Sequence, residues 1–316
     1  IDNIISKVRI KTNWHIIINF NSLTRFREDF GQYIDEVIPI QKIYNNSTES
    51  YFDFSSLTEQ QINLLEKNLN EKLYGHKEFK KEFINQIKNY SILYNLDEIK
   101  IMSLLICGDS GTGKTELARI VHETFFSDSN IIKINLGNYK TQGAINSLIG
   151  SPKGYYGSER GGELSNKIKN SDSKVILIDE FEKATPSVFH FFYELLEDGK
   201  FTDRHGTEHN LNGYIIVFTS NISKERYLKL LPDPLKSRFD MVYRFVELSS
   251  EEKIRFINES AKALSTKIYD NTSIKVKIDN ISCKLNLLIK YNNLRSIKRK
   301  VEDIVIEEYY KEIDNK

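Results

Sequence analysis

An eight-residue glycine-rich segment constrains the fold of this chain more than any other feature. Residues 108–115 read GDSGTGKT, which fits the pattern GxxxxGK[ST]. The segment follows an apolar run at residues 101–107 that we expect to be a buried strand, and it precedes an amphipathic stretch that we expect to be a helix. In that setting the backbone N–H groups of the loop and the positive end of the helix surround phosphate groups. The sequence therefore predicts a phosphate-binding loop in a parallel α/β sheet.

We expect this segment to bind the phosphates of a nucleotide. Lys114 would reach the β- and γ-phosphates, and the Thr115 hydroxyl would coordinate Mg²⁺. A plain glycine-rich turn is the alternative, and the strand–loop–helix setting disfavours it. ATP and Mg²⁺ are the expected cofactors. The predicted nucleotide-binding residues of the segment are Gly108, Asp109, Ser110, Gly111, Thr112, Gly113, Lys114, Thr115 and Glu116.

A second apolar run ends in two acidic residues. Residues 175–178 read VILI, and Asp179 and Glu180 follow them. Ligands of α/β sheets bind at the carboxyl ends of the strands, so both carboxylates would face the nucleotide. We expect Asp179 to help hold Mg²⁺ and Glu180 to act as the general base for the attacking water. An exposed acidic pair without chemistry is the alternative. Together the two motifs predict ATP hydrolysis.

Composition narrows the class of protein further. Hydrophobic residues make up 40% and charged residues 28% of the 316 residues, which excludes a mostly disordered chain. The net charge of +1 gives no global positive field, which disfavours nucleic acid as a partner. Two cysteines, Cys107 and Cys283, exclude a disulfide framework and favour a cytoplasmic location. No apolar run is long enough to span a membrane, so no membrane association is expected. Because the chain begins with Ile1, we expect it to be a piece of a longer protein.

Sequence patterns divide the chain into three expected parts. Residues 1–57 show alternating apolar residues from Val8 to Phe20 and would form a β-containing module, either a docking appendage or a partner platform. Residues 58–248 would form a large α/β domain with a five-stranded parallel sheet, and residues 249–316 a small, mainly α-helical domain. Thr58 and Gln61 fit a capping box that begins a helix. The expected strands are residues 101–107, 131–136, 175–178, 214–218 and 241–245, and the clearest helices are residues 58–73, 77–93, 251–264 and 296–310.

Five segments, in order along the chain, resemble the second ATPase domain of the Clp family of AAA+ ATPases (ClpA, ClpB and ClpC). They are residues 148–157 (LIGSPKGYYG), 161–164 (GGEL), 179–184 (DEFEKA), 196–203 (LEDGKFTD) and 219–221 (TSN). The resemblance covers about residues 70–310. It implies an AAA+ P-loop domain followed by a helical lid, with nucleotide held between the two and against a neighbouring subunit.

The resemblance also implies a channel for polypeptide. Tyr155, with Tyr156 beside it, would grip a polypeptide in the axial pore, and glycines at both sides would let the loop swing. A generic surface loop is the alternative. Asp203, Arg204 and His205 would lie on a second, lower pore loop.

Three more residues would act on the nucleotide by the same resemblance. Asn221 would be the sensor that orients the lytic water, with capping of a helix over residues 222–231 as the alternative or additional role. Arg238 would be the arginine finger that reaches a neighbour's γ-phosphate, unless it is a solvent-facing helix residue. Arg295 would be the second sensor arginine, unless it only belongs to a basic helix face.

Two further positions depart from the family pattern. Leu73 and Tyr74 match the segment that contacts adenine, although His76 replaces the usual Gln. Asn293 stands where the family usually has Gly before the sensor arginine. Because Asn is the next best residue for an unusual backbone angle, we expect that turn to survive.

These features predict an ATP-driven ring, expected to be a homo-hexamer, that threads protein substrates through its pore. The alternative is a regulatory switch or assembly scaffold that controls a protein partner bound at residues 1–57 without threading. The absence of a DNA-binding motif further disfavours a nucleic-acid remodeller. Docking to the ClpP protease is also disfavoured, because the 16 residues between Asn221 and Arg238 contain no Ile-Gly-Phe or Ile-Gly-Leu tripeptide.

Overall fold

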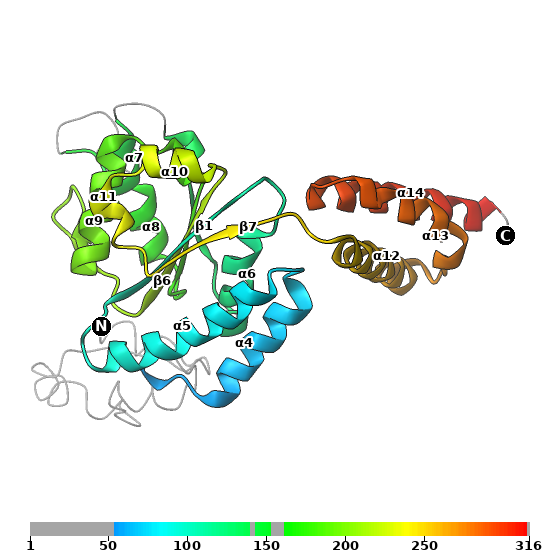
Figure 1. Cartoon of the computed structure of the whole chain (residues 1–316), viewed down its shortest axis with the longest axis horizontal. Coiled ribbons are helices and arrows are strands. Elements are labelled where there is room, and N and C mark those ends of the chain that lie inside the picture. Colours follow the sequence, from blue (N-terminus) through cyan, green and yellow to red (C-terminus); the bar gives the residue numbers. More distant parts are fainter. Residues whose placement is uncertain (1–53, 140–142, 153–160, 315–316) are drawn as a thin grey trace, which may run out of the picture. The chain divides into compact units, whose positions relative to one another are not determined.

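The computed structural model describes residues 54–139, 143–152 and 161–314 (Figure 1). The chain divides into two compact units, Ile1–Tyr51 and Phe52–Lys316, and the first lies outside the described residues. The strand predicted between Val8 and Phe20 also lies outside them, as do Tyr155 and Tyr156, the residues predicted to line a pore. All of the described residues belong to the second unit.

Five parallel strands form the central sheet, in the order β2-β3-β6-β1-β7. The prediction of a five-stranded parallel sheet is confirmed, and each predicted strand is present within two residues of its expected ends. The order places β1 and β3, which carry the two sequence motifs, on either side of β6. The strands are β1 (Ile101–Gly108), β2 (Ile132–Asn135), β3 (Val175–Asp179), β6 (Tyr214–Ser220) and β7 (Met241–Phe245).

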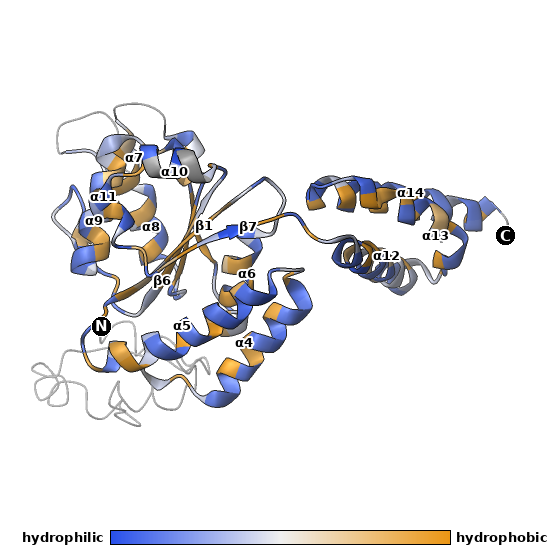
Figure 2. Cartoon of the chain, viewed as in Figure 1, coloured by the Kyte–Doolittle hydropathy of each residue, from blue (hydrophilic) through white to orange (hydrophobic). Residues whose placement is uncertain are grey.

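Both faces of the sheet are covered, because successive strand residues enter two different cores. In β3, Val175 and Leu177 belong to one core, whereas Ile176 and Ile178 belong to the other. This burial on both faces explains why β1 and β6 are apolar along most of their length (Figure 2). The first core is closed by α4 (Glu59–Lys72), α5 (Lys77–Asn95) and α6 (Lys114–Phe125), and the second by α7 (Ala144–Ile149), α8 (Glu163–Lys169), α9 (Pro186–Asp198), α10 (Lys224–Leu230) and α11 (Asp233–Lys236).

Local sequence signals set the beginnings of the long helices. The capping box predicted at Thr58 and Gln61 is present at the start of α4. A second capping box, at Ser249 and Glu252, begins α12. Between α4 and α5 the chain turns at Gly75, whose φ of 71° suits a residue without a side chain.

The C-terminal helices have a hydrophobic core of their own. Helices α12 (Ser250–Thr272), α13 (Ile278–Asn286) and α14 (Leu294–Asp314) pack together through this core. Ile257, Leu285 and Val301 contribute to it, one from each helix, and each is at most 1% exposed. Helices α12 and α14 extend further than the sequence predicts. No helix within the described residues combines the length and the apolar character needed to cross a membrane.

A small antiparallel hairpin stands apart from the main sheet. Its strands are β4 (Lys200–Thr202) and β5 (Glu208–Asn210). The hairpin is tied to the end of α7 by a hydrogen bond from the Arg204 N–H to the carbonyl of Ile149, at 3.1 Å. The hairpin therefore holds residues 203–207 beside Gly150, the C-cap of α7.

Candidate nucleotide-binding site

The glycine-rich loop joins the end of β1 to the start of α6. Gly108, Gly111 and Gly113 all have positive φ, at 138°, 82° and 98°. A Cβ on Gly108 would lie 2.3 Å from the carbonyl oxygen of Phe245, so a larger residue cannot be accommodated there without moving β7. Lys114 is the first residue of α6, so the N–H groups of Lys114 and Thr115 precede the first hydrogen bonds of the helix, which Glu116 and Leu117 donate to the Gly113 carbonyl. The loop thus has the shape and the free donors that a phosphate group requires.

Lys114 lies at the centre of the site. Its ammonium group donates hydrogen bonds to the carbonyls of Gly108 and Asp109, both at 2.7 Å, and to Oδ1 of Asn221 at 2.9 Å. Burial lowers the pKa of Lys114, and the nearby carboxylates of Asp179 and Glu182 oppose that change. The lysine is therefore a cation kept inside the loop by acceptors, at the place where phosphate oxygens would compete for it.

The acidic residues at the end of β3 lie at the same edge of the sheet. The Asp179 carboxylate accepts a hydrogen bond from the Thr219 hydroxyl and lies 3.2 Å from the Lys133 ammonium. Glu180 has a left-handed backbone (φ 59°), and its carboxylate accepts a hydrogen bond from Lys183 at 2.7 Å. A non-glycine residue in this conformation carries a cost that is common at functional sites.

The described residues contain no cluster of three or more His, Cys, Asp or Glu side chains able to hold a metal ion unaided. The predicted pair of Thr115 and Asp179 supplies only one hydroxyl and one carboxylate. Hard cations such as Mg²⁺ are often held by one or two protein oxygens together with substrate phosphates. The donor set fits a metal that arrives with a nucleotide.

Asn221 follows β6, the strand between β1 and β3, and it does not cap the next helix. That N-cap is Ser223, whose hydroxyl accepts from the Arg226 N–H, so the capping role considered for Asn221 is wrong. The reason is that the helix begins two residues later than predicted, at Lys224. The Asn221 side chain instead contacts Lys114 and Glu182.

Glu182 is a member of the site that the sequence patterns did not single out. Its Oε2 accepts hydrogen bonds from the Ser220 hydroxyl at 2.9 Å and from the Asn221 N–H at 3.2 Å. The short 3-10 helix Phe181–Lys183 turns the chain back so that this carboxylate meets the end of β6. The available signal is a third acidic residue, two positions after the acidic pair Asp179 and Glu180.

The segment before α5 contacts both the phosphate loop and α12. Leu73 is buried, and a Cβ on Gly113 would lie 3.0 Å from its side chain. The Tyr74 hydroxyl donates to Glu259 at 2.7 Å, and burial, followed by this hydrogen bond, raises the pKa of Tyr74. His76 Nε2 lies 2.9 Å from the Thr112 carbonyl. Of the two residues predicted to contact adenine, Leu73 thus lies beside the loop, and Tyr74 is bound to α12.

The start of α14 also touches the phosphate loop. The Leu294 N–H donates to the Gly111 carbonyl at 3.3 Å. Asn293 is not in the left-handed region expected for it; its side chain accepts from the N–H groups of Arg295 and Ser296, at 2.9 and 3.3 Å. The expected reason for Asn at this position was therefore wrong, because its side chain caps a helix. Arg295 itself is exposed in the first turn of α14.

Arg238 lies away from the Lys114 cluster. Its guanidinium pairs with Glu197 and lies 5.5 Å from the ring centre of Tyr193, and both partners belong to α9. The side chain is 36% exposed. This placement suits contact with another molecule more than contact with the phosphate loop of the same chain.

The tip of the β4–β5 hairpin contains the three residues predicted for a lower pore loop. The Asp203 side chain is 2% exposed and accepts hydrogen bonds from the N–H groups of His205 and Thr207 and from the ring of His209. The Asp203 carboxylate thus holds the hairpin tip together, and the assignment of these residues to a lower pore loop stays a prediction. Arg204 and His205 are exposed.

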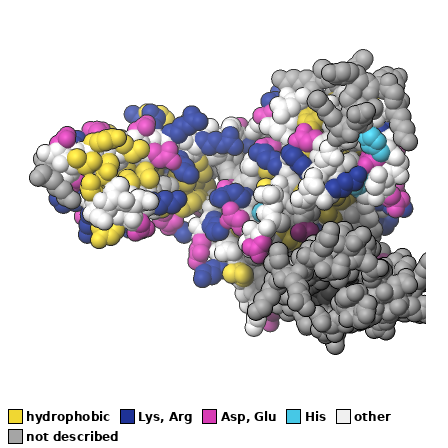
Figure 3. Space-filling model, turned by 180° about the vertical axis from the view of Figure 1, so that it is seen from behind, with side chains coloured by type: hydrophobic (Ala, Val, Ile, Leu, Met, Phe, Trp, Pro, Cys, Tyr) yellow, Lys and Arg dark blue, Asp and Glu magenta, His cyan; other side chains and the backbone are white. Residues whose placement is uncertain are grey.

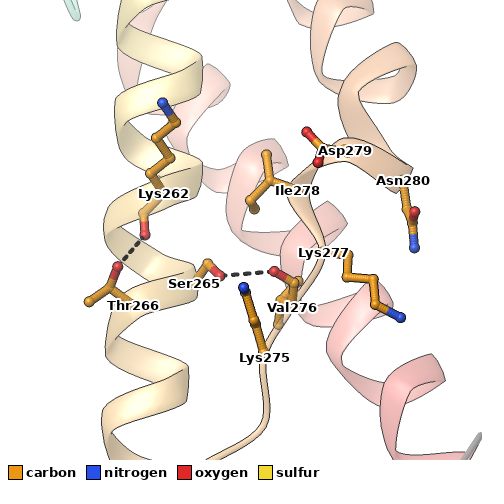
Figure 4. Close-up of a pocket in the computed structure, with 9 residues that line it drawn as sticks. All are labelled: Lys262, Ser265, Thr266, Lys275, Val276, Lys277, Ile278, Asp279 and Asn280. Atoms are coloured by element: carbon orange, nitrogen blue, oxygen red, sulfur yellow. Dashed lines mark hydrogen bonds between the residues drawn. The ribbon is translucent and has the colours of Figure 1, made fainter.

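A cavity of about 600 Å³ lies in the C-terminal helices, between α12 and α13 (Figure 4). Lys262, Lys275 and Lys277 are among its lining residues. The hydroxyls of Ser265 and Thr266 donate to the carbonyls of Val276 and Lys262, so neither proton is free for a ligand. The cavity has no glycine loop and is not the predicted nucleotide site.

Comparisons with known proteins place the chain among ATPases. A family model described as "AAA domain (Cdc48 subfamily)" matches residues 99–255. Chaperone protein ClpB from Prochlorococcus marinus is 29% identical over 78% of this chain and 28% of its own length. ClpC from Staphylococcus aureus, an ATP-dependent Clp protease ATP-binding subunit, is 32% identical over 68% of this chain and 25% of its own length. The chain therefore spans about a quarter of the length of these curated relatives.

A solved structure shares the fold. A closed-state cryo-EM reconstruction of Hsp104 with ATPγS and FITC-casein aligns with a TM-score of 0.68 and 23% identity, covering 79% of this chain and 48% of that chain. At this identity the likeness concerns the fold alone.

Proposed function

Because the chain carries an AAA+ ATPase domain of the Clp type, we propose that it works as one subunit of a ring that threads protein substrates through a central pore. ATP hydrolysis is the activity of the domain. We propose which residues carry it out, that the chain assembles into a ring, and that protein is the substrate.

The observation that carries the proposal is the meeting of three strand ends at Lys114. The ammonium of Lys114 (after β1) binds the amide of Asn221 (after β6). Asp179 ends β3, the strand next to β6, and Glu180 follows it. In the proposal, Lys114 contacts the β- and γ-phosphates and Asp179 holds Mg²⁺ with Thr115. Glu180 then acts as general base on the attacking water. Bound Mg²⁺ would neutralise charge that develops on the phosphates.

Assembly into a ring is supported by the position of Arg238 and by exposed apolar surface. Arg238 would supply its guanidinium to a neighbour's γ-phosphate, as arginine fingers do. Hydrophobic side chains gather on the surface of the C-terminal helices (Figure 3). Large exposed ones in that part include Leu287 at 67% and Tyr310 at 60%, and exposed apolar patches of this kind mark contact sites. We propose that residues 249–316 form the lid over the nucleotide. We further propose that the exposed apolar surface of these residues contacts a neighbouring subunit of the ring.

Threading is the function proposed for Tyr155 and Tyr156. The alternative is a switch that controls a fixed partner through residues 1–57. A threading ring would hold varied polypeptides, whereas a switch would hold that one partner. A protein substrate is favoured by two similar proteins, ClpB, which is named as a chaperone, and ClpC, which is named as the ATP-binding subunit of a protease. The cytoplasmic location expected from the cysteine content stays a prediction.

The test uses Glu180→Gln, which should bind ATP without hydrolysing it. The tagged full chain would be recovered with ATP from cells, and its particle mass and bound proteins measured. A ring of about six subunits that holds varied polypeptides, lost in Glu180→Gln/Tyr155→Ala, supports threading. A monomer, or an assembly that holds one partner regardless of Tyr155, refutes it and favours the switch.

A further inference from the structure

Glu182 connects the end of β6 to the turn after β3 through three hydrogen bonds. Its Oε2 accepts from the Ser220 hydroxyl and from the Asn221 N–H, at 2.9 and 3.2 Å. Its Oε1 accepts from Nδ2 of the Asn221 side chain at 3.4 Å. One carboxylate therefore binds both the backbone and the side chain of the same asparagine.

This arrangement decides which way the Asn221 amide faces. An asparagine amide has a donor end and an acceptor end of nearly equal shape, so only its partners fix its orientation. An ionised carboxylate accepts and never donates, so Glu182 attracts the donor end, Nδ2. The acceptor end, Oδ1, is thereby turned to Lys114, 2.9 Å from its ammonium. Glu182 and Lys114 hold the amide from opposite ends with complementary chemistry.

We infer that Glu182 is a positioning residue for ATP hydrolysis, which acts by fixing the orientation of the Asn221 amide beside Lys114. The inference rests on the hydrolytic role proposed for the Lys114 cluster. Glu182 contacts no phosphate or water in this role and is not a catalytic residue. Its effect passes through Asn221, because both the backbone N–H and the amide of that residue are held by it.

A purely structural role makes a different prediction. If Glu182 only holds the turn at Phe181–Lys183 against the end of β6, any hydrogen-bond acceptor of the same size would serve. Glutamine would then replace Glu182 without loss of ATP turnover. In the positioning role, glutamine fails although it has the same shape. With its oxygen on Ser220, its NH₂ group faces Nδ2 of Asn221, and two donors in contact favour a turned amide.

The experiment measures ATP turnover and nucleotide affinity in full-length Glu182→Gln, Asn221→Ala and the double variant. For Glu182→Gln we expect kcat to fall on the order of 10²-fold, as for a misplaced active-site group, while the Kd of a fluorescent ADP stays within about twofold. In the double variant, kcat should equal that of Asn221→Ala, since Glu182 has nothing left to orient. Glu182→Asp keeps the charge but is one methylene shorter, and it should also lower kcat.

Three results would overturn the inference. The first is wild-type kcat in Glu182→Gln or in Glu182→Asp. The second is an additive loss in the double variant, which would mean that Glu182 acts on Lys114 through its charge. The third is an equal loss of affinity and turnover, which would mean that the substitution disturbs the whole site and not the orientation of Asn221. Absence of ATP turnover in the wild-type ring would instead refute the proposed function, so the two failures are distinguishable. Ser220→Ala, which removes one donor to Oε2 but leaves the Asn221 amide paired, is the matched control and should keep most of the turnover.

Discussion

Replacement of Asp203 by asparagine tests how the β4–β5 hairpin is held together. The buried carboxylate accepts hydrogen bonds from the N–H groups of His205 and Thr207 at 2.9 and 3.0 Å and from His209 Nε2 at 2.9 Å. Lys169 adds an ammonium at 3.7 Å. Burial by itself raises the pKa of Asp203, but the hydrogen bonds outweigh burial and lower the pKa from 3.8 to about 2.

The magnitude follows from this pKa. A tenfold change in proton binding is worth about 1.4 kcal/mol, so the difference between 3.8 and about 2 contributes roughly 2.5 kcal/mol of stability at neutral pH. A carboxyl group with a lowered pKa stabilises the fold above pH 3.8 and loses its contribution as pH falls towards the folded-state pKa. About half would remain near pH 3. An asparagine side chain in place of Asp203 would keep the volume but lose the charge that the donors require.

We therefore expect Asp203→Asn to lower the free energy of unfolding by about 2 kcal/mol at pH 7 and by about 1 kcal/mol near pH 3. The midpoint of thermal unfolding, followed by circular dichroism, should fall by about 4–8 °C at pH 7. Asp233→Asn, at a side chain that is 93% exposed, is the matched control and should leave the midpoint unchanged. Equal losses at pH 7 and pH 3, or no loss at pH 7, would refute the linkage between this carboxylate and the hairpin.

Three other substitutions test other parts of the molecule. Phe181→Ala removes a fully buried ring that contacts four other phenylalanines, so it should lower the free energy of unfolding by about 3–5 kcal/mol in denaturant titrations. Leu64→Ala, at an exposed position, is the control and should change the free energy of unfolding little. Gly111→Ala should weaken binding of fluorescent ADP by about tenfold or more, because Gly111 has a φ of 82° and a Cβ there would lie 2.4 Å from the Asn293 side chain. Gly143→Ala is the control and should bind ADP normally, because a Cβ at Gly143 would have no atom within 4 Å. Arg238→Ala should lower ATP turnover of the assembled protein on the order of 10³-fold and leave ADP binding intact, and normal turnover would exclude a role as arginine finger.

Much of the fold follows from short-range patterns in the sequence. Continuous apolar strands mark a sheet buried on both faces, and the capping box at Thr58 places the start of α4 to the residue. The phosphate loop is equally visible, because its glycines, Lys114 and the flanking elements are neighbours in the chain. These predictions depend on residues within a few positions of one another.

The residues that sequence patterns missed depend on contacts between distant segments. Glu182 meets Asn221 only because β3 and β6 are adjacent in the sheet. Asp203 is buried by the hydrogen bonds of its own hairpin, and no charge pattern distinguishes it from an exposed loop residue. The usual Gly at this position suggests a backbone role for Asn293, whereas its side chain caps α14. Asparagine can serve in two ways, by adopting an unusual backbone angle or by capping a helix with its side chain. Only the three-dimensional contacts show which of the two roles a given asparagine has.

The contacts between the phosphate loop region and the C-terminal helices also determine when, during synthesis of the chain, the nucleotide site becomes complete. The hydrogen bond between Tyr74 and Glu259 joins residues 185 positions apart, and Leu294 reaches back to Gly111 across a similar distance. Chains emerge from the ribosome N-terminus first, at about 5–20 residues per second. The loop with Lys114 is therefore made many seconds before the residues that support its outer side. Synthesis must pass Leu294 before the phosphate loop has these neighbours, so the nucleotide site of a nascent chain stays incomplete until α14 begins.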